Sequence, residues 1–73
     1  MNLRQFEGKN VRLTDKDGEI FEGYVSDYIF AEDNAPEEVE ALILENLIRK
    51  SDGYKYENPV DFTALETQSV EIL

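Results

Sequence analysis

The sequence predicts a mainly β fold, a strongly bent antiparallel sheet or barrel with a short helix at its N-terminus. Apolar and polar residues alternate over residues 10–14 and again over residues 19–28, as half-buried strands require. The Asp17-Gly18 pair separates the two segments and favours the tight turn of a hairpin. The second segment has a glycine near its centre, Gly23, where a strand can bend or approach another backbone closely.

The length of the chain predicts one domain with a small core. A chain of 73 residues buries only about 60% of the surface that it exposes when unfolded. We therefore expect a single domain, residues 1–73, that is marginally stable as a monomer. Apolar residues make up 41% of the chain and include four Phe and four Tyr, which is enough for a core and argues against disorder.

The first residues predict a short helix that lies across one end of the sheet. Asn2 is a helix-capping residue, Gln5 can hydrogen-bond back to it, and Gly8 can supply the left-handed stop. Leu3 and Phe6 then share one face of the helix. Because a helix of this length does not persist alone in water, we expect that face to pack on the sheet.

The segment that follows the first strand has two interpretations, a calcium loop or a hairpin turn. An EF-hand loop needs oxygen ligands at positions 1, 3 and 5, a glycine at position 6 and a bidentate glutamate at position 12. Counted from Asp15, position 5 is Glu19, position 6 is Ile20 and position 12 is Ser26. The glycine comes too early and the last ligand is missing, so the segment predicts a hairpin.

The middle of the chain, residues 36–48, has the pattern of both a helix and a strand. Asn34 and Pro36 are helix-start signals, and the apolar residues recur at helical spacing, which gives the helix a slight advantage. The same residues also suit a strand covered on both faces. One face would then hold Val39, Ala41, Ile43 and Leu47, and the other Leu42, Leu44 and Ile48.

The last part of the chain predicts two β segments. Residues 53–62 form an aromatic strand interrupted by Pro59, and a final strand runs from Ser69 to Leu73. The core that we predict for the whole domain consists of Phe6, Val11, Leu13, Phe21, Val25, Ile43, Val70 and Ile72.

The composition argues against most enzyme chemistry. The chain has no cysteine and no histidine, which excludes disulfides, thiolate or imidazole metal ligands, and nucleophilic mechanisms that need Cys or a His base. The acidic residues of segment 32–38 are expected to form a solvated loop that associates at most weakly with Mg²⁺ or Ca²⁺. We therefore expect no enzymatic activity and no cofactor.

The charge and the N-terminus limit the partners. Seventeen acidic residues against seven basic ones leave a net charge of −10, which repels nucleic-acid phosphate and anionic lipid. A basic patch would come mainly from Arg4, Lys9, Arg12 and Lys16. The first residues lack the apolar segment of a signal peptide, and no apolar run approaches the roughly 20 residues that span a bilayer. We expect a cytoplasmic protein without membrane contact.

Residues 8–25, GKNVRLTDKDGEIFEGYV, resemble the first motif of the Sm-like (LSM) family, and SVEIL at the end resembles the family's last strand. The whole chain is similar to short bacterial LSM-domain proteins. The resemblance implies a strongly bent five-stranded antiparallel barrel in which residues 40–47 form the third strand. It also implies a homo-oligomer, since family members join the fourth strand of one subunit to the fifth of the next. The matching positions are Gly8, Val11, Leu13, Asp17-Gly18, Phe21, Gly23 and Val25.

The RNA-binding positions of the Sm family match this chain poorly. The family's aspartate, base-stacking residue and asparagine correspond, counted from the motif glycine, to Ile29, Ala31 and Asp33. One inserted residue would place Asn34 at the asparagine position but Glu32 where the base stacks. The family's second motif, an Arg-Gly pair, is absent from TALETQ. Base stacking contributes about 1–3 kcal/mol per base, so its loss would remove much of the affinity.

These observations predict a non-enzymatic Sm-like interaction or scaffold module that self-assembles through strand edges and binds a protein partner of unknown identity. The alternative is an RNA-binding Sm-like protein that acts as an oligomeric ring, although the net charge disfavours RNA. The candidate nucleic-acid contacts are Arg4, Lys9 and Asn34, and the candidate interface residues are Tyr54, Tyr56, Val70 and Ile72.

Overall fold

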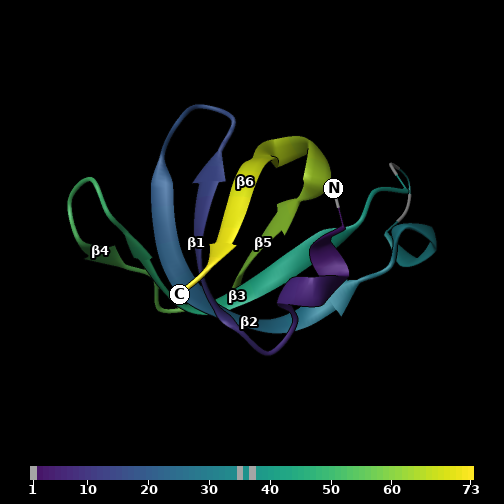
Figure 1. Cartoon of the computed structure of the whole chain (residues 1–73), viewed down its shortest axis with the longest axis horizontal. Helices are drawn as coiled ribbons and strands as arrows, with labels where there is room; N and C mark the ends of the chain where they lie inside the picture. Colours follow the sequence, from purple (N-terminus) through teal and green to yellow (C-terminus); the bar gives the residue numbers. More distant parts are fainter. Residues whose placement is uncertain (1, 35, 37) are drawn as a thin grey trace.

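The computed structural model describes residues 2–34, 36 and 38–73. The described residues form one antiparallel sheet of six strands with short 3-10 helices and no long helix (Figure 1). The prediction of a mainly β, antiparallel fold is confirmed. The elements are η1 (Leu3–Phe6), β1 (Asn10–Asp15), β2 (Ile20–Ile29), η2 (Ala31–Asp33), β3 (Ala41–Arg49), β4 (Tyr54–Lys55), β5 (Val60–Thr63), η3 (Ala64–Glu66) and β6 (Thr67–Ile72).

The strand order is β4-β3-β2-β1-β6, and β5 also pairs with β3. β4 pairs with the end of β3, at Ile48 and Arg49, whereas β5 pairs with its beginning, from Ala41 to Leu44. The aromatic strand expected before and after Pro59 is thus two short strands, and the sheet has six strands instead of five. Within the described residues no ladder joins β5 to β6, so the sheet is not closed and has two free edges.

The β1–β2 connection is the hairpin predicted from the Asp-Gly pair. The Asp15 side chain accepts hydrogen bonds from the backbone N–H groups of Asp17 and Glu19, both at 2.9 Å. Gly18 adopts a φ of +85°, a left-handed conformation that glycine reaches without a steric cost. The turn is therefore held by the Asp15 side chain and connects β1 to β2.

The close approach expected at Gly23 is present. A Cβ atom at this position would lie 3.1 Å from the carbonyl oxygen of Glu45 and 3.1 Å from a methyl group of Leu47. The β2–β3 register shifts beside this point, and Asn46 there has a φ of 55°. A bulge of this kind bends the strand that carries it, which gives the sheet its curvature.

The middle segment is a strand, as the family resemblance implied, and the helical interpretation is wrong. β3 lies between β2 on one side and β4 and β5 on the other, and its residues Leu42, Leu44 and Leu47 are buried in the core. The helix-start residue Asn34 instead closes a loop, since its side chain donates to the carbonyl of Val39 at 2.9 Å. Glu37 of the expected helix lies outside the described residues.

The N-terminal prediction is confirmed, with a 3-10 helix as the form. The Asn2 side chain accepts from the Arg4 N–H at 3.3 Å, and the Gln5 side chain donates to the Asn2 carbonyl at 2.9 Å. Leu3 and Phe6 are buried. The helix packs on the β2 and β3 side of the sheet (Figure 1).

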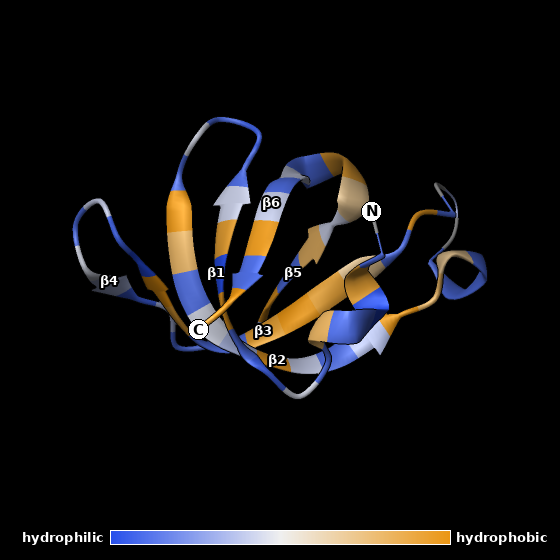
Figure 2. Ribbon diagram, viewed as in Figure 1, coloured by the Kyte–Doolittle hydropathy of each residue, from blue (hydrophilic) through white to orange (hydrophobic). Residues whose placement is uncertain are grey.

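Three of the predicted core residues are not buried, and the buried cluster contains five residues that the prediction omits: Leu3, Leu42, Leu44, Leu47 and Phe62. Ile43 is half-buried, Val70 packs only partly against the core, and Ile72 is 53% exposed. The bulge at Asn46 breaks strict alternation, so the inward residues of β3 are not those that alternation predicts. Among the residues that the structure describes, no strand pairs with the outer side of β6. Hydrophobic residues run along β3, whereas β1 and β6 alternate (Figure 2). The buried cluster is Leu3, Phe6, Val11, Leu13, Phe21, Val25, Leu42, Leu44, Leu47 and Phe62.

Candidate interaction surfaces

The outer edge of β6 has backbone groups that point away from the sheet. The Leu73 N–H donates to the Asn10 carbonyl at 2.9 Å, and the register pairs Val11 with Ile72. Bonded and non-bonded pairs alternate along an antiparallel ladder, so the backbone of Val70 and Ile72 is directed outward. Within the described residues β6 pairs with β1 alone, and these outward groups are left for water or another strand.

On the opposite edge, formed by β4 and β5, part of the outward backbone is already hydrogen-bonded within the chain. The Ala64 N–H donates to the Glu40 carbonyl at 2.8 Å, so the same alternation directs the backbone of Asp61 and Thr63 outward. The Thr63 N–H already donates to the Glu66 carboxylate at 3.1 Å.

Two further features reduce the number of free backbone groups on this edge. The Thr63 carbonyl accepts from the Thr67 hydroxyl at 2.8 Å, and Pro59, just before β5, has no N–H at all. The contact between Thr63 and Glu66 is a capping box around η3. The T-x-x-E in TALETQ is the sequence signature of this box, and it identifies Thr63 and Glu66 from the sequence alone.

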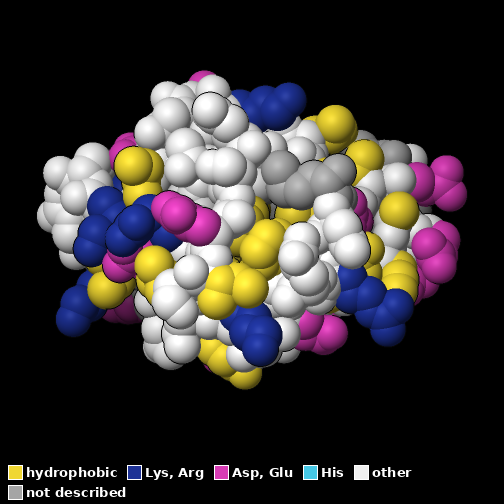
Figure 3. Space-filling model, in the orientation of Figure 1, with side chains coloured by type: hydrophobic (Ala, Val, Ile, Leu, Met, Phe, Trp, Pro, Cys, Tyr) yellow, Lys and Arg dark blue, Asp and Glu magenta, His cyan; other side chains and the backbone are white. Residues whose placement is uncertain are grey.

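The candidate interface residues divide between the two edges. Ile72 is 53% exposed, while Val70 is half-buried against the core. On the face shown in Figure 3, apolar side chains reach the surface around the C-terminal end of β6. Tyr54 is exposed and packs edge-on against the half-buried Tyr56, with ring centroids 4.8 Å apart.

The aromatic pair at β4 is held by an arginine. The Arg49 guanidinium lies over the Tyr54 ring at 5.3 Å and donates to the Tyr56 hydroxyl at 3.2 Å. It also forms two hydrogen bonds with Asp52, of 3.0 and 2.7 Å. The Arg49 hydrogen bond lowers the pKa of Asp52 to about 2. These contacts stabilise the β3–β4 turn and leave one face of Tyr54 exposed.

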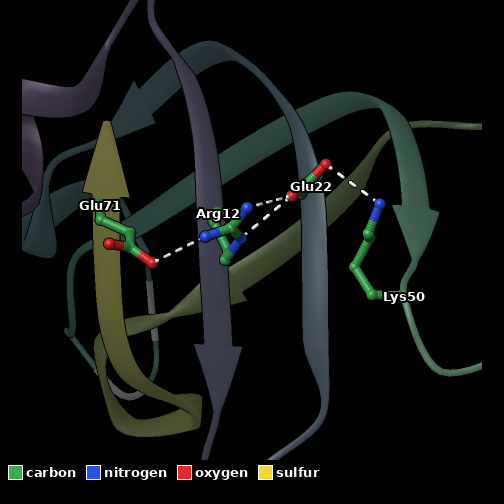
Figure 4. A network of polar contacts seen from close by, with 4 residues as sticks. All are labelled: Arg12, Glu22, Lys50 and Glu71. Carbon is green, nitrogen blue, oxygen red and sulfur yellow. Dashed lines mark hydrogen bonds and ion pairs between the residues drawn. The ribbon is translucent and has the colours of Figure 1, made fainter. Parts of the chain in front are cut away.

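A row of side chains with alternating charge crosses the outer face of the sheet, and its last member lies on β6 (Figure 4). Lys50 pairs with Glu22 at 3.3 Å, Glu22 with Arg12 at 2.9 Å, and Arg12 with Glu71 at 3.3 Å. The Arg12 hydrogen bond lowers the pKa of Glu22. Arg12, expected as part of a basic patch, is therefore neutralised within this row, whose last member, Glu71, lies on the free edge.

The candidate nucleic-acid contacts have different surroundings. The Arg4 guanidinium lies 5.1 Å from the ring centroid of Phe30, which is 40% exposed. Lys9 is exposed in the turn between η1 and β1. The side-chain amide of Asn34 is used within its own loop. The arrangement thus joins Arg4 with an aromatic ring and gives Asn34 a structural role.

A cavity of about 250 Å³ lies where the β1–β2 hairpin meets η3. Its carboxylates are partly used by the chain itself: Asp15 accepts from its own turn, and Glu66 from Thr63. Among the described residues no group of three or more candidate ligands could hold a metal ion. The same part of the chain has no helix long and apolar enough to cross a membrane. The lining residues are Asp15, Lys16, Asp17, Phe62, Leu65 and Glu66.

Comparison of the chain with models of known protein families, with curated proteins and with solved structures finds no match. The Sm-like resemblance therefore stays a prediction that depends on the residues quoted for it. The strand order and the difference between the two edges are observed in the structure and do not depend on that resemblance.

Proposed function

We propose that this chain is a non-enzymatic interaction module, Sm-like in character, that self-associates through its strand edges. The observation that supports the proposal is the outer edge of β6, where the outward backbone groups of Val70 and Ile72 lie beside an exposed apolar side chain. An unpaired edge is a template for another strand. The small core of a 73-residue chain also favours association, because association buries surface that stays exposed in the monomer.

The charge of the protein opposes this association. Two copies with a net charge of −10 each repel one another, and salt screens that repulsion beyond about 10 Å at 0.1 M ionic strength. Self-association should therefore strengthen as salt is added. Binding through ion pairs would weaken under the same conditions, so the direction of the salt effect separates association through ion pairs from association through backbone or apolar contacts.

Sedimentation velocity at low and high salt tests the proposal. We expect a species larger than the monomer whose population increases with salt and with protein concentration. A monomer under both conditions, across the concentration range, would refute self-association. Far-UV circular dichroism of the same samples checks that the β fold is retained at each salt concentration.

A second candidate, an RNA-binding ring, is favoured by the contact between Arg4 and the exposed ring of Phe30, since guanidinium and aromatic groups both stack on bases. Fluorescence anisotropy with labelled oligo-U and oligo-A at low salt tests it, with Arg4→Glu and Lys9→Glu as variants. Micromolar binding that weakens with salt and disappears in both variants would favour RNA. The net charge leads us to expect no binding.

A further inference from the structure

The regular part of the β6 edge is short and symmetric about one residue. The β1–β6 register shifts between Thr14 and Asp15, which leaves Gln68 as the extra residue of a bulge. Residues 69–73 beyond the bulge follow an undisturbed ladder. Glu71 is the central residue of this stretch, with the outward-directed Val70 and Ile72 on either side.

This geometry lets the edge pair with itself. If two copies of residues 69–73 lie antiparallel and centred on Glu71, Val70 of one copy falls opposite Ile72 of the other. Both residues direct their backbone groups outward, so each pair exchanges both of its hydrogen bonds. Every outward group in the regular stretch then has a partner.

The edge formed by β4 and β5 is a poorer partner for β6. Two residues of β5, Asp61 and Thr63, direct their backbone groups outward. The Thr63 N–H donates to Glu66 and its carbonyl accepts from Thr67, so within β5 Asp61 alone has both groups free of these contacts. Pro59 can accept a hydrogen bond but cannot donate one. A β6 strand laid here would leave part of its outward groups without a partner.

The side chains agree with the pairing of β6 with itself. Val70 and Ile72 lie on the core face of β6, where Val70 packs against the hydrophobic cluster and Ile72 is 53% exposed. Across the pair, each Ile72 would cover the Val70 of the partner subunit. The hydrophobic layer would then continue from one sheet into the next.

We infer that β6 pairs antiparallel with β6 of a second copy about a twofold axis at Glu71. The inference rests on the proposed self-association and specifies its edge and symmetry: a closed dimer in which the same patch is used twice. The two Glu71 side chains lie opposite each other, and their repulsion limits the affinity. Glu71→Gln removes that repulsion and should tighten the dimer by up to about fivefold.

Disulfide trapping tests this arrangement directly. The chain has no cysteine, so an introduced thiol is its only one. Residue 71 would face itself in a non-bonded pair, with Cα atoms about 4.5 Å apart, a separation that a disulfide can bridge. Ser69→Cys is the matched control, because Ser69 lies on the same face and would be opposite Leu73 of the partner copy. We expect Glu71→Cys to form a disulfide-linked dimer rapidly under mild oxidation and Ser69→Cys to stay reduced.

The outcomes separate this inference from the function on which it rests. If both variants are trapped at the same slow rate, or neither is, while the unmodified protein is oligomeric in sedimentation, pairing about Glu71 is wrong and self-association stands. If the unmodified protein is a monomer under all conditions, both proposals are wrong. Circular dichroism of each reduced variant confirms that the substitution leaves the fold intact.

Discussion

The two edges of this sheet are exposed to the same solvent but differ in what they offer another strand. At β6 the outward backbone groups of Val70 and Ile72 are open. At β5 the corresponding groups of Thr63 are used by Glu66 and Thr67. A strand at the border of a sheet therefore need not offer free backbone groups, because local hydrogen bonds can occupy them.

Loss of the β6 edge should have the largest effect. Ile72→Pro removes an outward N–H that the monomer does not use, and proline is tolerated where the N–H of an edge strand faces solvent. We expect self-association to weaken more than tenfold, because one donor is lost and the ring obstructs the neighbouring strand. Sedimentation velocity over a range of concentrations measures the change.

The control for this prediction is Ile72→Thr, which keeps the N–H and the β-branched shape but loses apolar surface. It should weaken association less than proline does. Equal weakening by both variants would mean that the side chain, and not the backbone edge, is responsible for association. Thermal unfolding of each variant shows whether the monomer has been affected.

Opening the β5 edge should have a smaller effect of the opposite sign. Glu66→Ala removes the acceptor for the Thr63 N–H and gives β5 a free outward donor, while the loss of the Glu66 hydrogen bonds costs about 1 kcal/mol of stability. We expect species larger than those of the unmodified protein in sedimentation velocity. Glu66→Gln keeps an acceptor oxygen and the capping box, so it should behave as the unmodified protein does. If Glu66→Ala does not change the size distribution, the capping box is not what closes this edge.

The local parts of the fold could be predicted from the sequence. The hairpin, the capped N-terminal turn and the inward positions Val11, Leu13 and Phe21 all follow from interactions between residues close in the chain. These rules hold because turn geometry and side-chain alternation are set over a few residues.

The parts that depend on other strands could not be predicted. The bulge at Asn46 shifts the side-chain alternation of β3. Asparagine adopts a positive φ more readily than most residues, but whether a bulge forms at one depends on the pairing with β2. The exposure of Ile72 likewise depends on whether a strand covers β6. The alternation of Val70, Glu71 and Ile72 predicts the face of the sheet on which Ile72 lies, but not how deeply Ile72 is buried.

The smallest expected effect, on stability, concerns the β3–β4 turn, where Arg49 and Asp52 form two hydrogen bonds. The hydrogen bond from Arg49 lowers the pKa of Asp52 from 3.8 to about 2. A carboxyl group whose pKa is lower in the folded state stabilises the fold above its unfolded pKa, and this contribution is lost as pH falls through the folded value. The unmodified protein should therefore lose part of its stability between pH 3.8 and about 2.

Asp52→Asn isolates this contribution, because asparagine still accepts from the Tyr54 N–H but has no charge for Arg49. Near neutral pH the variant should melt slightly below the unmodified protein, since the pair is partly exposed and screened by solvent. The two melting temperatures should converge as pH approaches 2, where Asp52 is protonated. Other carboxylates titrate in both proteins, so they cancel in the difference. A melting difference that stays constant down to this pH would show that the charge of Asp52 does not stabilise the turn.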